Sequence, residues 1–324
     1  MELSVLDTRK IERVGDVIRQ TYITCSACMS VWADGLSWAN AHPERVTKNP
    51  QEADNIAVLS CQVTDLAILN DLRTAERYHA QFPDKQILIS GCLAKRRDVD
   101  LPEFANRLET PRESYQFLWD LSLVHFEKPF WVRDFNESDK EHADGHLFRS
   151  KYPLRIGKGC PNHCTYCTIR VTRGDFEQYA TSRLEEEFLT FDNILLVADS
   201  PTEQQVKEWC AVAQKHRKGF SIRNVEPSVV VRCKDDLVSL AEQGLLPEFH
   251  SPIQSDNPDV LRDMHRNVQA TLQTMEIARG LKDKGVYVAT NIIIDYKIFR
   301  QDFSEVYKLY DYVSWNPLWD GVWN

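Results

Sequence analysis

The fold is decided by the stretch from Ile56 to Cys92, which begins Ile56-Ala-Val-Leu-Ser-Cys61 and ends Gln86-Ile-Leu-Ile-Ser-Gly-Cys92. Each apolar run has the length of a buried strand. Between the two runs, apolar residues recur at helical spacing at Leu66, Leu69, Leu72 and Ala75. The stretch therefore predicts a β-α-β unit whose two strands lie parallel.

A cysteine follows each of these predicted strands. The upstream segment Thr21-Tyr-Ile-Thr-Cys-Ser-Ala-Cys28 predicts a third strand, which also ends at a cysteine. Because the carboxyl ends of parallel strands share one edge, where open α/β sheets build their sites, we expect Cys28, Cys61 and Cys92 at that edge.

A polar, charged loop over Asn136–Gly145 marks a boundary within the chain. The chain has 324 residues, and at about 150 residues per domain this length predicts two domains. We place a Rossmann-like N-terminal domain at residues 1–135, a linker at 136–150 and a second domain at 151–324.

The second part alternates strands and helices. Helices are expected at 184–189, after Ser200-Pro201, and at 235–242, 269–284 and 302–310, between strands at 154–156, 193–198, 220–223, 248–253 and 286–294. Such units predict a full or partial parallel (β/α) barrel, so the chain belongs to the α/β fold class.

The composition is that of a globular protein, with 43% hydrophobic and 27% charged residues. Acidic residues exceed basic ones and give a net charge of −9, which argues against nucleic-acid binding by bulk charge alone but allows a local basic patch. The run Lys95-Arg-Arg97 is a candidate phosphate contact, or simply a solvated face. We expect no membrane span and no signal peptide, and hence a cytoplasmic protein.

Nine cysteines in a reducing compartment favour metal binding over disulfides. The sharpest pattern is Gly159-Cys160-Pro-Asn-His-Cys164-Thr-Tyr-Cys167. Three thiolates at this spacing can ligate three of the four irons of one iron–sulfur cube and leave the fourth iron open. The alternatives are a zinc knuckle that lacks its fourth ligand, and chance.

This spacing, with Tyr166 just before the third cysteine, resembles the radical S-adenosylmethionine (SAM) superfamily. The resemblance implies that Cys160, Cys164 and Cys167 hold a 4Fe–4S cluster whose open iron chelates SAM. One-electron reduction then releases a 5′-deoxyadenosyl radical.

The order of Cys28, Cys61 and Cys92 ahead of this motif is similar to that of the methylthiotransferase family. The similarity implies that these three cysteines hold a second, auxiliary 4Fe–4S cluster in the N-terminal domain. Cys25, three positions before Cys28, remains an alternative ligand.

Three further residues are candidate cofactor contacts. Arg183 lies in a segment that resembles the one after the family's cluster loop, and Gln254 and Ser255 lie in its H-x-P-x-Q-S block. The alternative for Gln254 and Ser255 is a purely structural turn.

The family replaces a C–H bond by C–S–CH3 and consumes two molecules of SAM. The resemblance therefore implies a transferase whose substrate is tRNA, in particular an adenosine near the anticodon. It also implies an electron donor such as flavodoxin or ferredoxin. The alternatives are an aspartate of a ribosomal protein as substrate, and a non-catalytic, cluster-bearing binding protein. We expect a monomer, and we assign no catalytic acid or base.

The sequence departs from the family at two places. Asp295-Tyr-Lys-Ile-Phe299 replaces the glycine-rich G-F-P-G-E-T turn, which puts SAM binding there in question. The sequence also ends just past the last predicted barrel strand, so we expect the C-terminal TRAM domain of the family to be absent.

Overall fold

The computed structural model describes residues 12–13, 20–62, 65–96, 99–109, 120–126, 151–294, 296–297 and 301–316. The chain divides into two compact units, Met1–Arg133 and Asp134–Asn324. The predicted linker at 136–150 lies outside the described residues, and the predicted domain limits stay a prediction.

The first unit contains a parallel sheet in the order β1-β5-β4-β3-β2-β6. Its described elements are β1 (Glu12–Arg13), β2 (Thr21–Cys25), α1 (Met29–Ala41), η2 (Pro43–Arg45), β3 (Asn55–Ser60), α2 (Asp65–Gln81), β4 (Gln86–Gly91), η3 (Leu93–Lys95), β5 (Ala105–Glu109), η4 (Leu121–Leu123) and β6 (Val124–Phe126). The predicted β-α-β unit is confirmed, with β3 and β4 paired in parallel.

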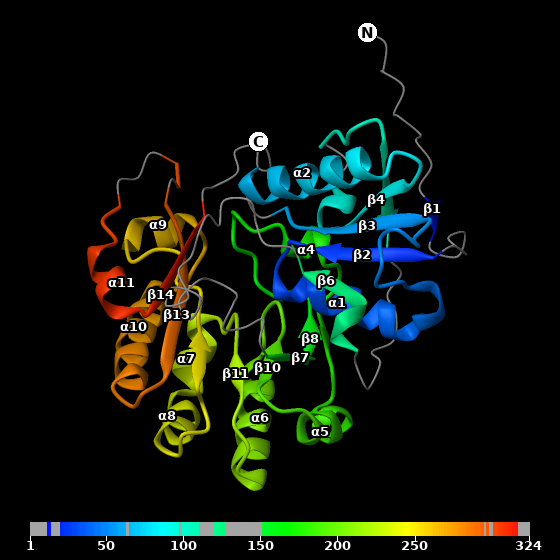
Figure 1. Ribbon diagram of the computed structural model, residues 1–324. Helices are drawn as coiled ribbons and strands as arrows, with labels where there is room; N and C mark the ends of the chain where they lie inside the picture. Colours follow the sequence, from blue (N-terminus) through cyan, green and yellow to red (C-terminus); the bar gives the residue numbers. More distant parts are fainter. Residues whose placement is uncertain are drawn as a thin grey trace. The chain divides into compact units, whose positions relative to one another are not determined.

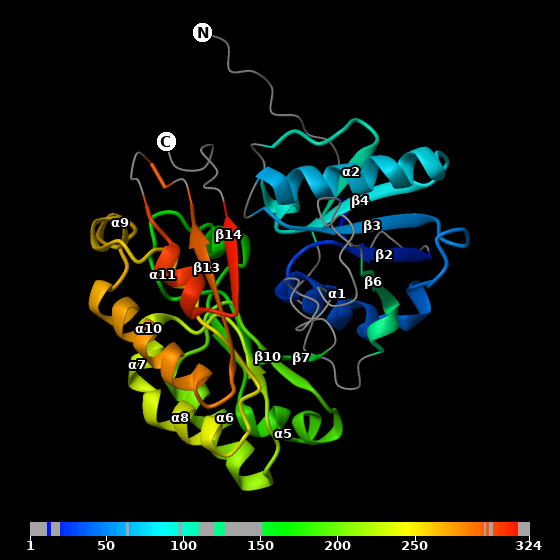
Figure 2. The ribbon, with the colours of Figure 1, turned by 60° about the vertical axis from the view of Figure 1, so that its left-hand side comes forward.

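Helices α1 and α2 lie on opposite faces of this sheet (Figures 1 and 2). Strand β3 is buried along its whole length, and alternate residues point to opposite faces. Ile56 and Val58 pack in the core cluster that includes Ile68 of α2. On the other face, Leu59 lies so close to Gly35 of α1 that a Cβ at Gly35 would be 2.1 Å from it. The central strand is therefore covered on both sides, which explains its continuous apolar sequence.

The second unit contains six parallel strands in chain order, β7-β10-β11-β12-β13-β14, with β8 and β9 as a separate antiparallel pair. Its elements are β7 (Tyr152–Arg155), β8 (Gly157–Lys158), α4 (Ile169–Thr172), β9 (Glu177–Gln178), α5 (Thr181–Thr190), β10 (Ile194–Val197), α6 (Glu203–His216), β11 (Ser221–Ile222), α7 (Pro227–Arg232), α8 (Lys234–Glu242), β12 (Glu248–His250), α9 (Pro258–Asp263), α10 (Val268–Lys282), β13 (Tyr287–Ile293), α11 (Ser304–Leu309) and β14 (Tyr312–Asn316).

Parallel neighbours in chain order, joined by helices, make a partial (β/α) barrel. Helices α6, α8 and α10 lie along one face of its sheet (Figures 1 and 2). Helix α6 shows why: Val206, Trp209, Cys210 and Ala213 are buried on one stripe, as their spacing predicts. The α/β fold class is thus confirmed.

Three local predictions were wrong. The strand predicted up to Cys28 ends at Cys25, and Cys28 instead caps the start of α1. The strand predicted over 248–253 ends at His250. The run 286–294 is not the last barrel strand, because β14 pairs with β13 beyond α11. None of the helices in the described ranges combines the length and apolar character needed to cross a membrane.

Candidate functional site

The three cysteines of the C-x-x-x-C-x-x-C motif lie in the loop between β8 and α4, and all three are partly buried. Burial, together with negative charge on Cys164 and Cys160, raises the pKa of Cys167 to about 12. Burial also raises the pKa of Cys160, whose Sγ accepts a hydrogen bond from the Asn162 N–H at 3.4 Å.

A buried carboxylate anchors the start of this loop. Asp199, just after β10, accepts the N–H of Gly159 at 2.8 Å and the Nε–H of Arg173 at 3.1 Å, and its Oδ2 lies 3.6 Å from Arg155 Nη2. Burial favours the protonated acid, but the two guanidinium groups outweigh it and hold the pKa of Asp199 below its usual range.

Gly159 is required at this anchor. Its φ is +73°, and a Cβ would lie 2.8 Å from the carbonyl oxygen of Asp175. The close approach explains why a glycine directly precedes the first cysteine of the motif.

Arg266 packs against the other end of the loop. Its guanidinium donates to the Tyr166 hydroxyl at 3.2 Å and to the Pro252 carbonyl at 2.6 Å, and Nη1 lies 3.9 Å from Cys164 Sγ. Its buried Nε has no hydrogen-bond partner within the part of the chain that the structure describes. A buried donor without a partner indicates room for an acceptor that is not part of the protein.

A cavity of about 420 Å³ opens beside the cysteine loop. Its lining includes His163 and Cys164 from the loop, Glu226 and Ser228 after β11, and Arg266 and Asn267 after α9. The volume is that of a small-molecule site. Because it presents both a carboxylate and guanidinium groups, the cavity suits a ligand that carries an ammonium and a carboxylate group.

The donor set fits an iron–sulfur cluster better than a single ion. Across the described ranges, no three His, Cys, Asp or Glu side chains converge to hold one metal ion. A cube is ligated at separate irons, so its thiolates need not converge on one point. Three neighbouring thiols, an uncommitted Arg266 donor and an adjacent cavity therefore suit a cluster with a chelated ligand.

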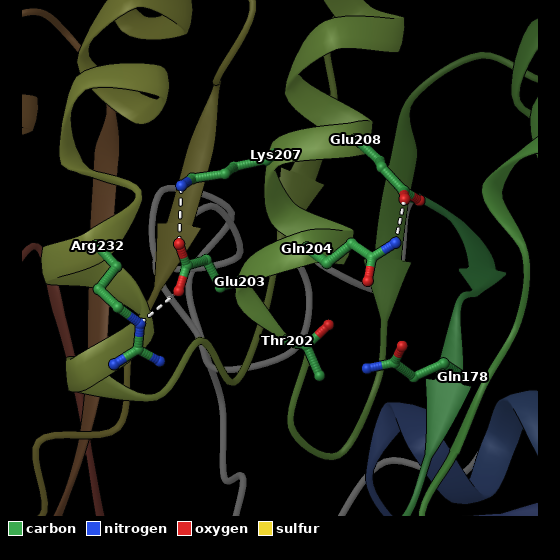
Figure 3. Close-up of a pocket in the computed structure, with 7 residues that line it drawn as sticks. All are labelled: Gln178, Thr202, Glu203, Gln204, Lys207, Glu208 and Arg232. Atoms are coloured by element: carbon green, nitrogen blue, oxygen red, sulfur yellow. Dashed lines mark hydrogen bonds and ion pairs between the residues drawn. The ribbon is translucent and has the colours of Figure 1, made fainter.

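A second cavity, of about 600 Å³, lies around the start of α6 (Figure 3). Glu203 lies between Lys207, at 2.7 Å, and Arg232, at 2.5 Å, while the Gln204 amide donates to Glu208 at 2.8 Å. Its charged groups already pair with one another across an open surface, so we assign it no ligand.

In the first unit, the three predicted auxiliary ligands lie at the carboxyl ends of adjacent strands β2, β3 and β4. Cys61 and Cys92 are buried and Cys28 is exposed. The Cys92 N–H donates to the Ser60 carbonyl at 3.0 Å, which joins the turns after β3 and β4. The structure therefore brings all three to one edge of the sheet, as expected, and their role as ligands stays a prediction.

Cys25 lies differently from this trio. It is the last residue of β2, has no exposed surface, and pairs in register with residues of β3 and β6. The turn that follows carries Cys28 out to the surface, which favours Cys28 over Cys25 as a ligand.

Asp71 of α2 is a site residue that the sequence analysis missed. Its carboxylate accepts the Cys61 N–H at 2.6 Å and the Ser26 hydroxyl, and burial raises its pKa to about 7. It connects the turns that carry Cys28 and Cys61. An acidic residue on a helix resembles a surface charge, so its position alone did not reveal this role.

The three predicted cofactor contacts do not line the cavity beside the cysteine loop. Arg183 is exposed on α5. Gln254, at φ +68°, bonds through its backbone to β13, and the buried Ser255 hydroxyl donates to Gln301 and accepts from the Asn257 N–H. Among the described residues lining that cavity, none is one of these three. Their role as contacts stays a prediction.

Comparison with known proteins identifies the class. Residues 154–310 match the Radical SAM superfamily, which implies an iron–sulfur cluster and SAM. Among solved structures, the radical S-adenosylmethionine methyltransferase TsrM from Kitasatospora setae, with tryptophan substrate and a SAM analogue bound, has a TM-score of 0.48 at 10% identity, over 85% of this chain and 67% of that one.

The curated relatives that match this chain are methylthiotransferases. The ribosomal protein uS12 methylthiotransferase RimO of Treponema denticola is 24% identical over 89% of this chain and 70% of its own length. The tRNA-2-methylthio-N(6)-dimethylallyladenosine synthase of Deinococcus radiodurans is 26% identical over 94% of this chain and 65% of its own length. A RimO of Carboxydothermus hydrogenoformans is 32% identical over 51% of this chain and 37% of its own length.

The radical SAM match over residues 154–310 and these relatives over most of the chain support the radical SAM methylthiotransferase family. The predictions of this family and of a transferase enzyme are confirmed by these relatives. The chain spans less than two thirds of the length of two of the three.

Proposed function

We propose that this protein is a methylthiotransferase that replaces a C–H bond of a tRNA adenosine near the anticodon by C–S–CH3. The observation that carries the proposal is the cysteine loop. Cys160, Cys164 and Cys167 lie together in the short loop between β8 and α4, and Cys164 lines a cavity with Glu226 and Arg266.

In this proposal the three loop thiols hold a 4Fe–4S cluster and SAM occupies the cavity. When bound, the cluster supplies the electron that cleaves SAM to a radical. Arg266, whose Nε has no partner among the described residues, would bind the carboxylate of the methionine moiety, and Glu226 would bind its ammonium group. The residues of the chain bind and orient the cofactor.

An auxiliary 4Fe–4S cluster at Cys28, Cys61 and Cys92 completes the proposal. Its support is the placement of these cysteines at the ends of three adjacent parallel strands. With three cysteine ligands each, the two clusters would each keep one iron free, one for radical formation and the other for sulfur delivery.

For the substrate, we favour tRNA over a ribosomal protein, although relatives act on either. The synthase of tRNA-2-methylthio-N(6)-dimethylallyladenosine matches 94% of this chain, and the uS12 methylthiotransferase 89%. Near the auxiliary site only part of the basic run is available, since Lys95 is exposed while Arg96 is buried and residue 97 lies outside the description. An electron donor such as flavodoxin or ferredoxin, a monomeric state and a cytoplasmic location belong to the same proposal.

The test is mass spectrometry of tRNA nucleosides from a host that lacks its own tRNA methylthiotransferase. Expression of this protein should produce a methylthio-adenosine, and a Cys160→Ala/Cys164→Ala/Cys167→Ala variant should not. An unmodified tRNA together with a methylthiolated uS12 peptide would move the substrate to the ribosomal protein. Purified protein that binds iron but releases no 5′-deoxyadenosine from SAM would favour a cluster-bearing binding protein.

A further inference from the structure

Tyr296 stands in the segment that replaces the family's glycine-rich turn, directly after β13. Its side chain is only 2% exposed. It packs in a small core with Val260, Met264 and Ile293, against which the ring of Tyr166 lies. Tyr166 belongs to the cysteine loop, so Tyr296 is part of the small core that supports this loop.

The Tyr296 hydroxyl links the loop to helix α9. It donates to Asp263 Oδ2 at 2.5 Å and lies 3.2 Å from the Oγ1 of Thr165, which stands between Cys164 and Cys167. The Thr165 hydroxyl also lies 3.0 Å from the Asp263 carbonyl oxygen. The Thr165 hydroxyl donates to this carbonyl oxygen, so contacts with both Tyr296 and Asp263 hold Thr165 at the end of α9.

Two further contacts complete this arrangement. The Thr165 N–H donates to the Met264 carbonyl at 3.2 Å, and the ammonium group of Lys297 pairs with the Asp263 carboxylate. Lys297 has φ +52°, a left-handed conformation that is costly for a residue with a side chain. The strained backbone at Lys297 therefore adjoins the contacts that the Tyr296 and Lys297 side chains make with Asp263.

We infer that Tyr296 and Asp263 are positioning residues that hold the Cys164–Cys167 part of the loop in the geometry needed to ligate its cluster. This inference rests on the proposed assignment of these thiols as cluster ligands. A bulky hydroxylated side chain bonded to the loop thus stands where the family has a glycine-rich turn.

The test compares Tyr296→Phe with the wild type in the reconstituted, full-length holoprotein. A chelator is added, and alkylation of each cysteine is followed by peptide mass spectrometry, so that exposure of Cys164 and Cys167 is measured site by site. Removing one net hydrogen bond should speed their exposure about five-fold. Thr165→Val should have a similar effect, Thr165→Ser should restore the wild-type rate, and the double variant should be no faster than either single variant.

Tyr152→Phe is the matched control, because Tyr152 also donates a buried hydroxyl in the same unit, to Glu187, away from the loop. Equal exposure rates in Tyr296→Phe, Tyr152→Phe and the wild type would overturn the inference. The same alkylation is repeated on the iron-free chain. Protein that takes up no iron would contradict the proposed function. The alkylation rates of Cys164 and Cys167 in the iron-free chain would still show whether the Tyr296 and Asp263 hydrogen bonds hold the loop.

Discussion

The carboxylate of Asp71 accepts a hydrogen bond of 2.6 Å from the backbone N–H of Cys61. The same carboxylate accepts the hydroxyl of Ser26, from the turn after the neighbouring strand β2. One buried side chain on α2 therefore holds two turns that carry predicted ligands of the auxiliary cluster.

Replacing Asp71 by Ala should loosen this edge of the sheet. It leaves a buried N–H and a hydroxyl without an acceptor, at a cost of about 1–3 kcal/mol. Hydrogen exchange at the amides of β3 is the measurement, since a chain of two units need not unfold in one step. Asp84→Ala, at an exposed position beyond the end of α2, is the control. Unchanged protection in Asp71→Ala would contradict the link.

Replacing Asp199 by Ala should destabilise the second unit much more. The change leaves the buried guanidinium groups of Arg155 and Arg173 without their shared carboxylate, which costs about 3–5 kcal/mol. Amide exchange in β7 and β10 should accelerate accordingly. The exposed pair Arg279–Glu276 offers the control, because Glu276→Ala should leave exchange unchanged. Similar rates in both variants would argue against the buried network.

His250 makes stability depend on pH in a defined direction. Its Nδ1 accepts the Asn224 N–H at 3.1 Å, so Nε2 carries the proton and donates to Asn291 at 3.0 Å. Burial, then the charge of Arg223, lowers the pKa of His250 from 6.5 to about 3. Between these values the unfolded chain binds the proton and the folded chain does not, so stability falls as the pH falls.

The expected loss is about 2 kcal/mol at pH 5 relative to pH 8. The free energy of unfolding is measured against pH for the wild type and for His250→Gln. The difference between the two curves isolates His250, because the other titrating groups contribute equally to both. Glutamine can still accept one hydrogen bond and donate another but does not titrate. Parallel pH curves for the two proteins would exclude this effect.

The two candidate ligands Cys25, at the end of β2, and Cys28, at the start of α1, predict different iron contents. Cys28→Ala should reduce reconstituted iron from about eight to about four per chain, because it removes one of three ligands of the auxiliary cluster. Cys25→Ala should leave iron unchanged, since Cys25 is fully buried in β2. Cys210→Ala, on the buried stripe of α6, controls for the loss of a packed thiol. Loss of iron in Cys25→Ala alone would reverse the assignment.

Many strands and helices could be predicted because their sequence patterns, such as apolar runs and helical spacing, are local. The run Ile56–Ser60 is apolar throughout since α1 and α2 cover both of its faces, and its strand appears almost as predicted. Strand β14 was missed because its short sequence becomes a strand only through five residues paired with β13. The same applies to β5 and β6, which lie in a segment broken by prolines.

The sequence by itself determined the ligand chemistry, because three thiols within eight residues stay together in any fold, and cysteines after successive parallel strands meet at one edge. Only the tertiary structure decided which other groups surround them. Asp71, Asp199 and Asp263 are separated in the chain from most of the groups that they hold, and each would pass for a surface charge. What makes them part of the sites is packing between elements, which brings each carboxylate against one particular loop and, for Asp71 and Asp199, removes the water that would otherwise satisfy it.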